Sequence, residues 1–393
     1  MYFLSEPGIE CALGSNAQEL RKRLVVRGEP DPAPADTFLH RSGRWVAEAN
    51  NGLAPLPSSL NDFDCRNNRL AASALQQIRP SIDRAISRYG SSRVAVVMGT
   101  STSGIAQSEQ AVRTLQLESQ YPQNYHAIQG VLGGLADFVS AYLGTNGPAF
   151  TISTACASSA SAVLSARRLL RLGVCDAVVV GGADSLCEMT LQGFAALEAL
   201  SSDYSKPFSA DRDGINLGEA AAIFLLSREP AEVALLGGAA SSDAHHISAP
   251  HPAGDGAYKV MSGALADAGL APADVDYLNL HGTGTVQNDS MESLAVNKLF
   301  GDKLPCSSTK SMTGHTLGAS GALELSICWL LLTQAFDWRF PPSLYGDQRD
   351  TSLAPIRLTD SSETGLRRPR HCLSNSFAFG GSNVSLLLGR TDA

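Results

Sequence analysis

A cysteine stands where an apolar, strand-like run gives way to a helix of small residues. The run Phe-Thr-Ile-Ser-Thr-Ala leads to Cys156, and Ala-Ser-Ser-Ala opens the predicted helix. Unpaired backbone N–H groups and the positive end of the helix dipole favour a thiolate there, and the thiolate is the nucleophilic form of cysteine. A buried cysteine is otherwise a small apolar side chain, so this segment alone leaves both interpretations open. Cys156 is the candidate nucleophile.

Three further reactive side chains follow similar strand-to-loop junctions in the second half of the chain. His281 stands in Asn-Leu-His-Gly-Thr-Gly-Thr, and Lys310 and His315 stand in Ser-Thr-Lys-Ser-Met-Thr-Gly-His. A helix predicted to begin near Thr316 lowers the pKa of His315, which therefore stays neutral and able to donate an N–H. Two such donors on one carbonyl oxygen would stabilise the enolate formed when a β-carboxylate leaves as carbon dioxide. A single histidine is more often structural, so this hypothesis depends on their pairing with Cys156.

An acidic side chain and two hydroxyls accompany these groups. Glu324 lies in an otherwise apolar helix, where a carboxylate is costly unless it is paired, and Lys310 is its natural partner. We expect a structural ion pair rather than direct proton transfer. Thr283 and Thr285 alternate beside His281 and could hydrogen-bond an amide-bearing arm, although threonine is common in Gly-rich turns.

An acyl group attacked by the cysteine needs donors for the developing oxyanion, and backbone N–H groups are the usual ones. The N–H of Cys156 is one. A second is expected from residues 375–383, where paired glycines allow close approach of the backbone to a ligand. Taken alone, such a loop is more often a simple turn.

Composition excludes several classes of protein. The 393 residues are 44% hydrophobic and carry a net charge of −8, which indicates a globular protein and argues against a nucleic-acid binder. The eight cysteines form no C-x-x-C pair, so a reducing, cytoplasmic compartment without a zinc cluster is expected. Walker, H-E-x-x-H and G-x-G-x-x-G motifs are absent, and the adjacent His245 and His246 are a weak metal pair. No metal and no membrane span are predicted.

Apolar runs and amphipathic stretches alternate along the chain, which predicts an α/β fold. We expect strands at 92–98, 177–180, 222–226 and 275–280, helices at 161–172 and 257–268, and a buried core helix at 321–336. The two halves, 1–230 with the cysteine and 231–393 with the histidines and lysine, look like two copies of one plan. The Pro-rich segment 28–57 is expected to form surface loops.

Taken together, these residues resemble the β-ketoacyl-[acyl-carrier-protein] synthases, the condensing enzymes of fatty-acid and type II polyketide pathways. The resemblance covers most of the chain, and its motifs fall in the family's order and spacing. They are residues 154–158, 180–184, 206–214, 241–246, 281–285, 308–315 and 375–381.

The resemblance implies a thiolase fold, with two pseudo-symmetric halves in a five-layered α-β-α-β-α sandwich. It implies that Cys156 takes an acyl chain from the phosphopantetheine arm of an acyl carrier protein and then condenses it with a malonyl thioester. His281 and His315 would promote decarboxylation, while Lys310 and Glu324 would hold the electrostatics of the site. No other cofactor is implied. A homodimer is expected, and a heterodimer with a related subunit is the alternative.

Further roles come from the same resemblance. Phe379 would gate acyl entry, and its N–H would complete the oxyanion hole with that of Cys156. Arg66 and Arg69 are candidates for docking the acidic carrier, because a net-negative protein needs local positive charge to attract it. The implied substrate-binding residues are Thr283, Thr285, Phe377, Gly380, Asn383 and Thr102.

Other members of this fold remain alternatives. A chain-length-factor subunit shares the fold but generally lacks the reactive cysteine, whereas a thiolase needs a second cysteine, for which only Cys372 is suitably late in the chain. A stand-alone enzyme of the chalcone-synthase type would use Cys, His and Asn. Residues 100–104 differ from the family's commonest pocket floor, which is typical of specialised pathways such as aryl-polyene or polyketide assembly, so the acyl substrate stays open.

Overall fold

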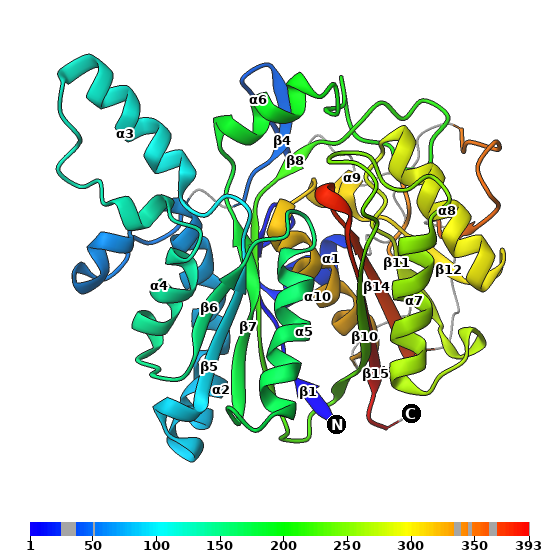
Figure 1. Ribbon diagram of the computed structural model, residues 1–393, viewed down its shortest axis with the longest axis horizontal. Coiled ribbons are helices and arrows are strands. Elements are labelled where there is room, and N and C mark those ends of the chain that lie inside the picture. Colours follow the sequence, from blue (N-terminus) through cyan, green and yellow to red (C-terminus); the bar gives the residue numbers. More distant parts are fainter. Residues whose placement is uncertain (25–36, 50–51, 334–338, 345–347, 361–367, 393) are drawn as a thin grey trace.

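The computed structural model describes residues 1–24, 37–49, 52–333, 339–344, 348–360 and 368–392. Its elements form five layers that follow one another across Figure 1, with helices outside and between two groups of strands. The helices are α1 (Ala17–Leu24), α2 (Arg66–Tyr89), α3 (Ile105–Glu118), α4 (Gly134–Leu143), α5 (Ser158–Arg171), α6 (Glu188–Ala196), α7 (Asp255–Ala268), α8 (Val286–Phe300), α9 (Lys310–Thr313) and α10 (Ser320–Leu332). This α-β-α-β-α order is the sandwich that the family resemblance implies, and it confirms the predicted α/β class.

The strands pair in the order β13-β12-β11-β14-β15-β10-β1-β9-β7-β5-β6, with β2 also on β9. The short β1 lies antiparallel between β9 and β10 and so joins the two halves of the sheet. The strands are β1 (Tyr2–Leu4), β2 (Gly8–Cys11), β5 (Val94–Gly99), β6 (Ala149–Ile152), β7 (Ala177–Asp184), β9 (Ala220–Ser227), β10 (Val233–Ser242), β11 (Tyr277–Asn279), β12 (Pro305–Ser307), β13 (Arg357–Leu358), β14 (His371–Phe377) and β15 (Ser382–Arg390). The predicted boundary at residue 230 lies between β9 and β10.

Apolar side chains on both faces explain why the strands are buried. In β7, Val178 and Val180 join the cluster that packs on α5 and α10, while Ala177 and Val179 join the cluster with α2 and α4. Successive strand residues point to opposite faces, so one continuous apolar run packs against the helices on both sides of the sheet.

The central layer contains α10, and every one of its residues is buried. The predicted core helix is therefore confirmed up to residue 332, whereas residues 334–336 lie outside the described part of the chain. Among the described residues, no helix has the length and apolar character that crossing a membrane requires.

The prediction of surface loops at 28–57 is wrong in part. Residues 28–36 and 50–51 lie outside the described residues, but β3 (Phe38–Arg41) and β4 (Arg44–Ala47) form a hairpin that continues onto β8 (Leu217–Gly218). The two strands lack alternating burial, so their sequence carries little strand signal. This small sheet matters because β8 leads directly to the site.

Candidate active site

The candidate nucleophile lies on a tight turn from β6 to α5, which we name the cysteine elbow (residues 154–158). Ala155 has a φ of 48°, a left-handed conformation that costs a residue with a Cβ about 1–2 kcal/mol. Ser158 fixes the turn, because its hydroxyl accepts the Thr154 N–H at 2.9 Å and donates to the Ala155 carbonyl at 2.6 Å. The elbow therefore places Cys156 just before the first turn of α5.

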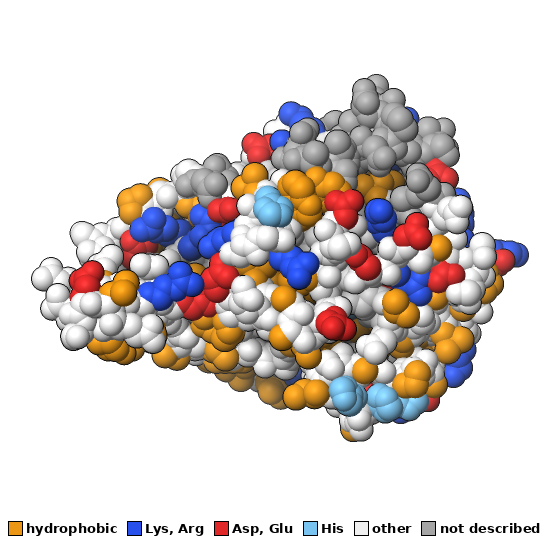
Figure 2. Space-filling model, turned by 90° about the horizontal axis from the view of Figure 1, so that it is seen from above, with side chains coloured by type: hydrophobic (Ala, Val, Ile, Leu, Met, Phe, Trp, Pro, Cys, Tyr) orange, Lys and Arg blue, Asp and Glu red, His pale blue; other side chains and the backbone are white. Residues whose placement is uncertain are grey.

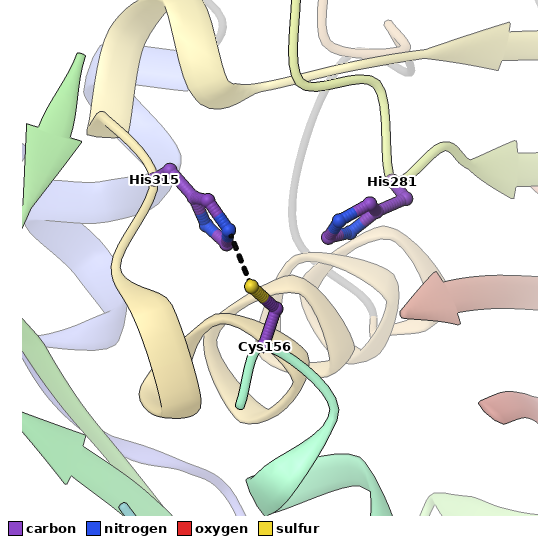
Figure 3. A group of neighbouring side chains, drawn as sticks. All are labelled: Cys156, His281 and His315. Atoms are coloured by element: carbon purple, nitrogen blue, oxygen red, sulfur yellow. Dashed lines mark hydrogen bonds between the residues drawn. The ribbon is translucent and has the colours of Figure 1, made fainter. Parts of the chain in front are cut away.

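The structure brings Cys156, His281 and His315 together. Figure 3 shows both imidazole rings beside the sulfur, and His315 Nε2 lies 2.9 Å from Cys156 Sγ. The two ring centroids are 5.5 Å apart and their planes cross at 84°. All three side chains are buried, so the convergence that the spacing of the motifs predicts is present in one place.

His315 is positioned by the small sheet. Its N–H donates to the carbonyl of Asn216 at 2.7 Å, and its own carbonyl accepts the N–H of Gly218 at 3.0 Å. The helix predicted directly after it is only a 3₁₀ turn, Leu317–Ala319, and α10 begins at Ser320. The pKa of His315 is therefore not lowered by a helix N-terminus at position 316.

His281 opens a turn that we name the histidine loop (residues 281–284). The carboxylate of Glu292, in α8, accepts the N–H of His281 at 2.8 Å and the N–H of Gly282 at 2.7 Å. Asp289, in the same helix, accepts a further N–H of the loop at 3.2 Å. Two buried carboxylates thus hold the loop by its backbone.

Sequence reasoning missed Glu292 and Asp289. Burial raises the pKa of Glu292 to about 7 and that of Asp289 to about 6, although the hydrogen bonds to their carboxylates oppose this. The available signal was an acidic pair, three residues apart on one helix face, directly after the histidine motif. Neither group lines the cavity, so both position the loop rather than touch a substrate.

Lys310 and Glu324 form the predicted ion pair, and both side chains are buried. The Lys310 ammonium also donates to the carbonyl of His281 at 2.6 Å, while Ser320 donates to the Glu324 carboxylate at 3.1 Å. Burial raises the pKa of Glu324, and Lys310 works against this rise. The pair therefore connects the histidine loop to α10.

The electrostatics keep both histidines neutral. Burial, and then the charge of Lys310, hold the pKa values of His281 and His315 well below the ordinary range. Both histidines are neutral, as the sequence predicts for His315, but the cause is burial and the charge of Lys310 rather than a helix N-terminus. Their Nδ1 atoms have no hydrogen-bond partner in the described part of the chain, and His315 contacts the Cys156 sulfur through Nε2.

The predicted thiolate is wrong for the unloaded protein. Burial raises the pKa of Cys156 to about 12, although Lys310 and a hydrogen bond with the backbone of Phe379 act in the opposite direction. Desolvation thus outweighs Lys310 and the backbone hydrogen bond together. The sulfur is a thiol that must lose its proton during reaction, and His315 Nε2 is the base within reach.

A cavity of about 420 Å³ opens onto the three groups. Five of the predicted substrate-binding and gating residues line it: Thr283, Thr285, Phe377, Phe379 and Asn383. The hydroxyls of Thr283 and Thr285 are 3.0 Å apart, and the ring of Phe379 contacts that of Phe194 at 5.4 Å between centroids. The backbone of Phe379 beside the sulfur fits the predicted second oxyanion donor.

Two predicted binding residues lie elsewhere. Thr102 is fully buried, and its hydroxyl donates to Asp184 at 2.7 Å, so it is part of a structural network and not of the cavity wall. Gly380 is absent from the cavity lining, and its N–H donates to the carbonyl of Ile247 at 2.8 Å. Its φ of 82° instead shapes the turn that presents Phe379.

The predicted docking arginines are already engaged. Arg66 forms an ion pair with the buried Glu219 and a second, at 3.4 Å, with Glu48. Arg69 binds Asp64 with two contacts, at 2.6 and 2.7 Å. Arg66 neutralises the internal carboxylate of Glu219 and is therefore a poor anchor for another protein, whereas the Arg69–Asp64 pair is partly exposed. Docking at these two arginines stays a prediction.

The same three groups could also ligate a soft metal. The ligand atoms of Cys156, His281 and His315 lie within 4.8 Å of one another, and thiolate with imidazole suits zinc. Lys310, whose charge already lowers the pKa values of both histidines, disfavours a second cation here. A metal-free site remains the prediction.

Two stacked α/β halves, an elbow cysteine and two neutral histidines in one cavity define a thiolase-fold condensing enzyme. The description "Beta-ketoacyl synthase, N-terminal domain" matches residues 70–231, and "Beta-ketoacyl synthase, C-terminal domain" matches residues 233–344. The chain belongs to the β-ketoacyl synthase family and is an acyltransferase of the elongating condensing type.

Its relatives agree with this membership. Nodulation protein E of Rhizobium leguminosarum bv. trifolii is 36% identical, covering 80% of this chain and 79% of that protein. The 3-oxoacyl-[acyl-carrier-protein] synthase 2 of Synechocystis is 30% identical, covering 93% and 97%. A chain of the complex between a ketosynthase and its chain length factor from Xenorhabdus doucetiae is 43% identical with a TM-score of 0.93, covering 99% of this chain and 98% of that chain.

Proposed function

We propose that the chain takes an acyl group from an acyl carrier protein onto Cys156 and condenses it with a malonyl group carried in the same way. The observation that carries this proposal is the 2.9 Å approach of His315 Nε2 to Cys156 Sγ, with His281 on the other side of the same cavity. The first half-reaction needs a thiol and a base, and the second needs two neutral hydrogen-bond donors.

In the first half-reaction, His315 Nε2 takes the thiol proton as the sulfur bonds to the carbonyl carbon of the acyl thioester. The oxyanion is held by the N–H groups of Cys156 and Phe379. Collapse breaks the bond to the pantetheine sulfur, which leaves as a thiol with the proton returned by His315. The acyl group is then on Cys156, and the imidazole is neutral again.

In the second half-reaction, the bond between the malonyl carbon and its carboxylate breaks, and carbon dioxide leaves. The electron pair moves into an enolate whose oxygen accepts an N–H bond from His281 and, once proton exchange with solvent has moved the ring hydrogen of His315 from Nδ1 to Nε2, a second one from His315. The enolate carbon attacks the acyl carbonyl, a carbon–carbon bond forms, and the Cys156 sulfur leaves and regains a proton from solvent. Neutral imidazoles suit this step because they donate without surrendering a proton.

Intact-protein mass spectrometry tests this function. After incubation with an acyl-loaded carrier, the wild type should gain the mass of the acyl group, and Cys156→Ala should gain none. Cys175→Ala is the matched control, since Cys175 is also buried and has its pKa raised to about 11 but lies outside the cavity. Failure to find an adduct on the wild type would overturn the proposal.

A partner of the same fold is proposed along the free edge of the sheet. Within the described residues, β6 pairs only with β5, and Phe150 on β6 is 38% exposed. The exposed Val131 and Leu132 adjoin it, because Thr151 of β6 donates to the carbonyl of Gly133 at 3.3 Å. An unpaired edge flanked by apolar side chains is suited to strand addition.

The solved relative bound to its chain length factor favours a heterodimer with a related subunit over a homodimer. Phe150→Glu should prevent the association seen by light scattering. Leu172→Glu is the control, because Leu172 is 76% exposed at the end of α5 and far from this edge. Equal association of both variants would rule out the β6 edge.

The alternatives have less support. A chain length factor has no need of a thiol, base and donors converging in one cavity. A thiolase would need a second cysteine there, but Cys372 is fully buried in β14 and does not line the cavity. A specialised pathway and a cytoplasmic location stay predictions, and a panel of carriers with different acyl chains would test the former.

A further inference from the structure

The hairpin of β3 and β4 presents two arginines directly opposite one another. Arg41 and Arg44 are partners in the strand pairing on either side of the turn Ser42-Gly43. Both turn residues have positive φ, 50° and 78°, which is the tight turn that joins two antiparallel strands. Like charges placed directly opposite in a hairpin are destabilising. This repulsion calls for an explanation.

Nothing in the described chain neutralises these arginines directly. Neither Arg41 nor Arg44 forms an ion pair there, and the same holds for the exposed Arg113 of α3. Two acids lie beside them. Glu109 of α3 accepts the N–H groups of Glu188 and Met189, and the pKa of Glu188 is lowered first by a hydrogen bond from Ser42 and further by Gln192, Arg41 and Arg113. Three arginines thus face two carboxylates, and the patch keeps an excess of positive charge.

The patch also has an apolar component. Residues two apart on a strand share a face, so Leu39 lies on the same side of the hairpin as Arg41, and Leu39 is 49% exposed. Met189, next to Glu188, is 51% exposed. Positive charge beside exposed apolar side chains is the composition of a protein-binding surface rather than of an ordinary solvated loop.

The hairpin lies close to the entrance of the cavity. The hydroxyl of Ser42 donates to Glu188 at 2.7 Å, which fastens the hairpin to the start of α6, and Phe194 near the end of α6 lines the cavity. Six helical residues separate these two points, about 9 Å along the axis. Figure 1 shows β4 beside α6, and Figure 2 shows Lys and Arg side chains gathered toward α3 on this face.

We propose that the acidic carrier protein docks on this basic hairpin patch, made of Arg41, Arg44 and Arg113 with Leu39 and Met189. This inference rests on the proposed function, because the carrier is its substrate. Docking here places the carrier beside the start of α6, and the arm would then follow the helix to Phe194 and the sulfur. The patch supplies positive charge in addition to Arg66 and Arg69, which already take part in ion pairs.

Charge reversal with two kinds of substrate tests the patch. The double variant Arg41→Glu/Arg44→Glu should raise KM for carrier-bound acyl substrate by about tenfold or more and weaken its dependence on salt. Acyl transfer from a carrier-free thioester of N-acetylcysteamine should stay unchanged, because that substrate makes no docking contact. This second activity also shows that the variant is folded.

The control is Arg168→Glu/Arg171→Glu. These arginines are exposed in the last turn of α5, have no ion pair in the described chain, and lie at the opposite end of the molecule. Equal KM values for the two double variants would overturn the docking site. Loss of turnover with both substrates in the wild type would instead overturn the proposed function. The single variant Arg113→Glu should raise KM for the carrier-bound acyl substrate less than the double variant does.

Discussion

The cysteine elbow and the histidine loop are both turns that lead from a strand into a helix, yet they are held by different means. The elbow is held by neutral groups, the Ser158 hydroxyl and the strained backbone at Ala155. The histidine loop is held by the buried carboxylates of Glu292 and Asp289. The turn that carries the nucleophile is therefore held by uncharged groups, whereas the turn that carries a fixed donor is held by ionisable ones.

Replacing the thiol should have the largest effect on activity. It should also separate the role of the cysteine elbow in condensation from the role of the histidine loop in decarboxylation. Cys156→Gln should abolish condensation but still release carbon dioxide from malonyl carrier, because the donors His281 and His315 remain. Adding His281→Ala should lower that release by about 10²–10³-fold, the usual loss for one donor to a developing oxyanion. Radiolabelled carbon dioxide measures both.

Cys175→Ala is the control for the first substitution and should condense normally. Unchanged carbon dioxide release in Cys156→Gln/His281→Ala would show that the histidine loop plays no part in decarboxylation.

Breaking the ion pair behind the histidine loop should have the next largest effect, this time on stability. Lys310→Ala leaves Glu324 as an unpaired buried carboxylate and should lower the free energy of unfolding by about 3–5 kcal/mol. The apolar double variant Lys310→Met/Glu324→Leu should recover most of this loss, since it removes both charges. Urea denaturation gives the comparison, and equal loss in both variants would mean that packing, not charge, is responsible.

The sequence was sufficient for features that depend on local pattern. The α/β alternation, the buried α10 and the pairing of Lys310 with Glu324 follow from apolar runs and from one carboxylate in an apolar helix. Small residues around Cys156 and His281 marked the turns, because only such residues permit close approach of the backbone.

The remaining features depend on tertiary packing. Arg66 looked free, but Glu219, 153 residues away, binds it. The pKa of Cys156 was expected to fall, but burial raises it to about 12, since desolvation is set by neighbours from both halves. Glu292 was missed because it binds backbone N–H groups, which no side-chain motif reveals.

The histidine loop should respond to pH through Glu292. Burial raises the pKa of this carboxyl from 4.5 to about 7, so its contribution to stability is present below pH 4.5 and is lost as pH rises toward 7. Glu292→Gln cannot ionise. The free energy of unfolding of the variant, relative to wild type, should therefore improve by up to about 3 kcal/mol over this range.

Denaturation at several pH values measures this difference, and other titrating groups cancel because both proteins contain them. Glu118→Gln, at the exposed end of α3, is the control. The pH dependence of its free energy of unfolding should match that of wild type. If the free energy of unfolding of Glu292→Gln also showed the same pH dependence as wild type, ionisation of Glu292 would have no effect on the stability of the histidine loop.

The elbow should show the smallest effect, because its strain lies in one backbone angle. Ala155→Gly removes the penalty at φ 48°, worth about 1–2 kcal/mol, and adds an entropic cost of about 0.5–1 kcal/mol. The variant should thus be as stable as wild type or slightly more so, by up to about 1.5 kcal/mol. Ala157→Gly, where φ is −93°, relieves no strain, bears the entropic cost and loses a buried methyl group, so this variant should be less stable. Opposite signs for two identical substitutions, two residues apart and measured by thermal unfolding, would locate the strain at the residue before the nucleophile. Equal signs would mean that Ser158, rather than a strained backbone, determines the position of the thiol.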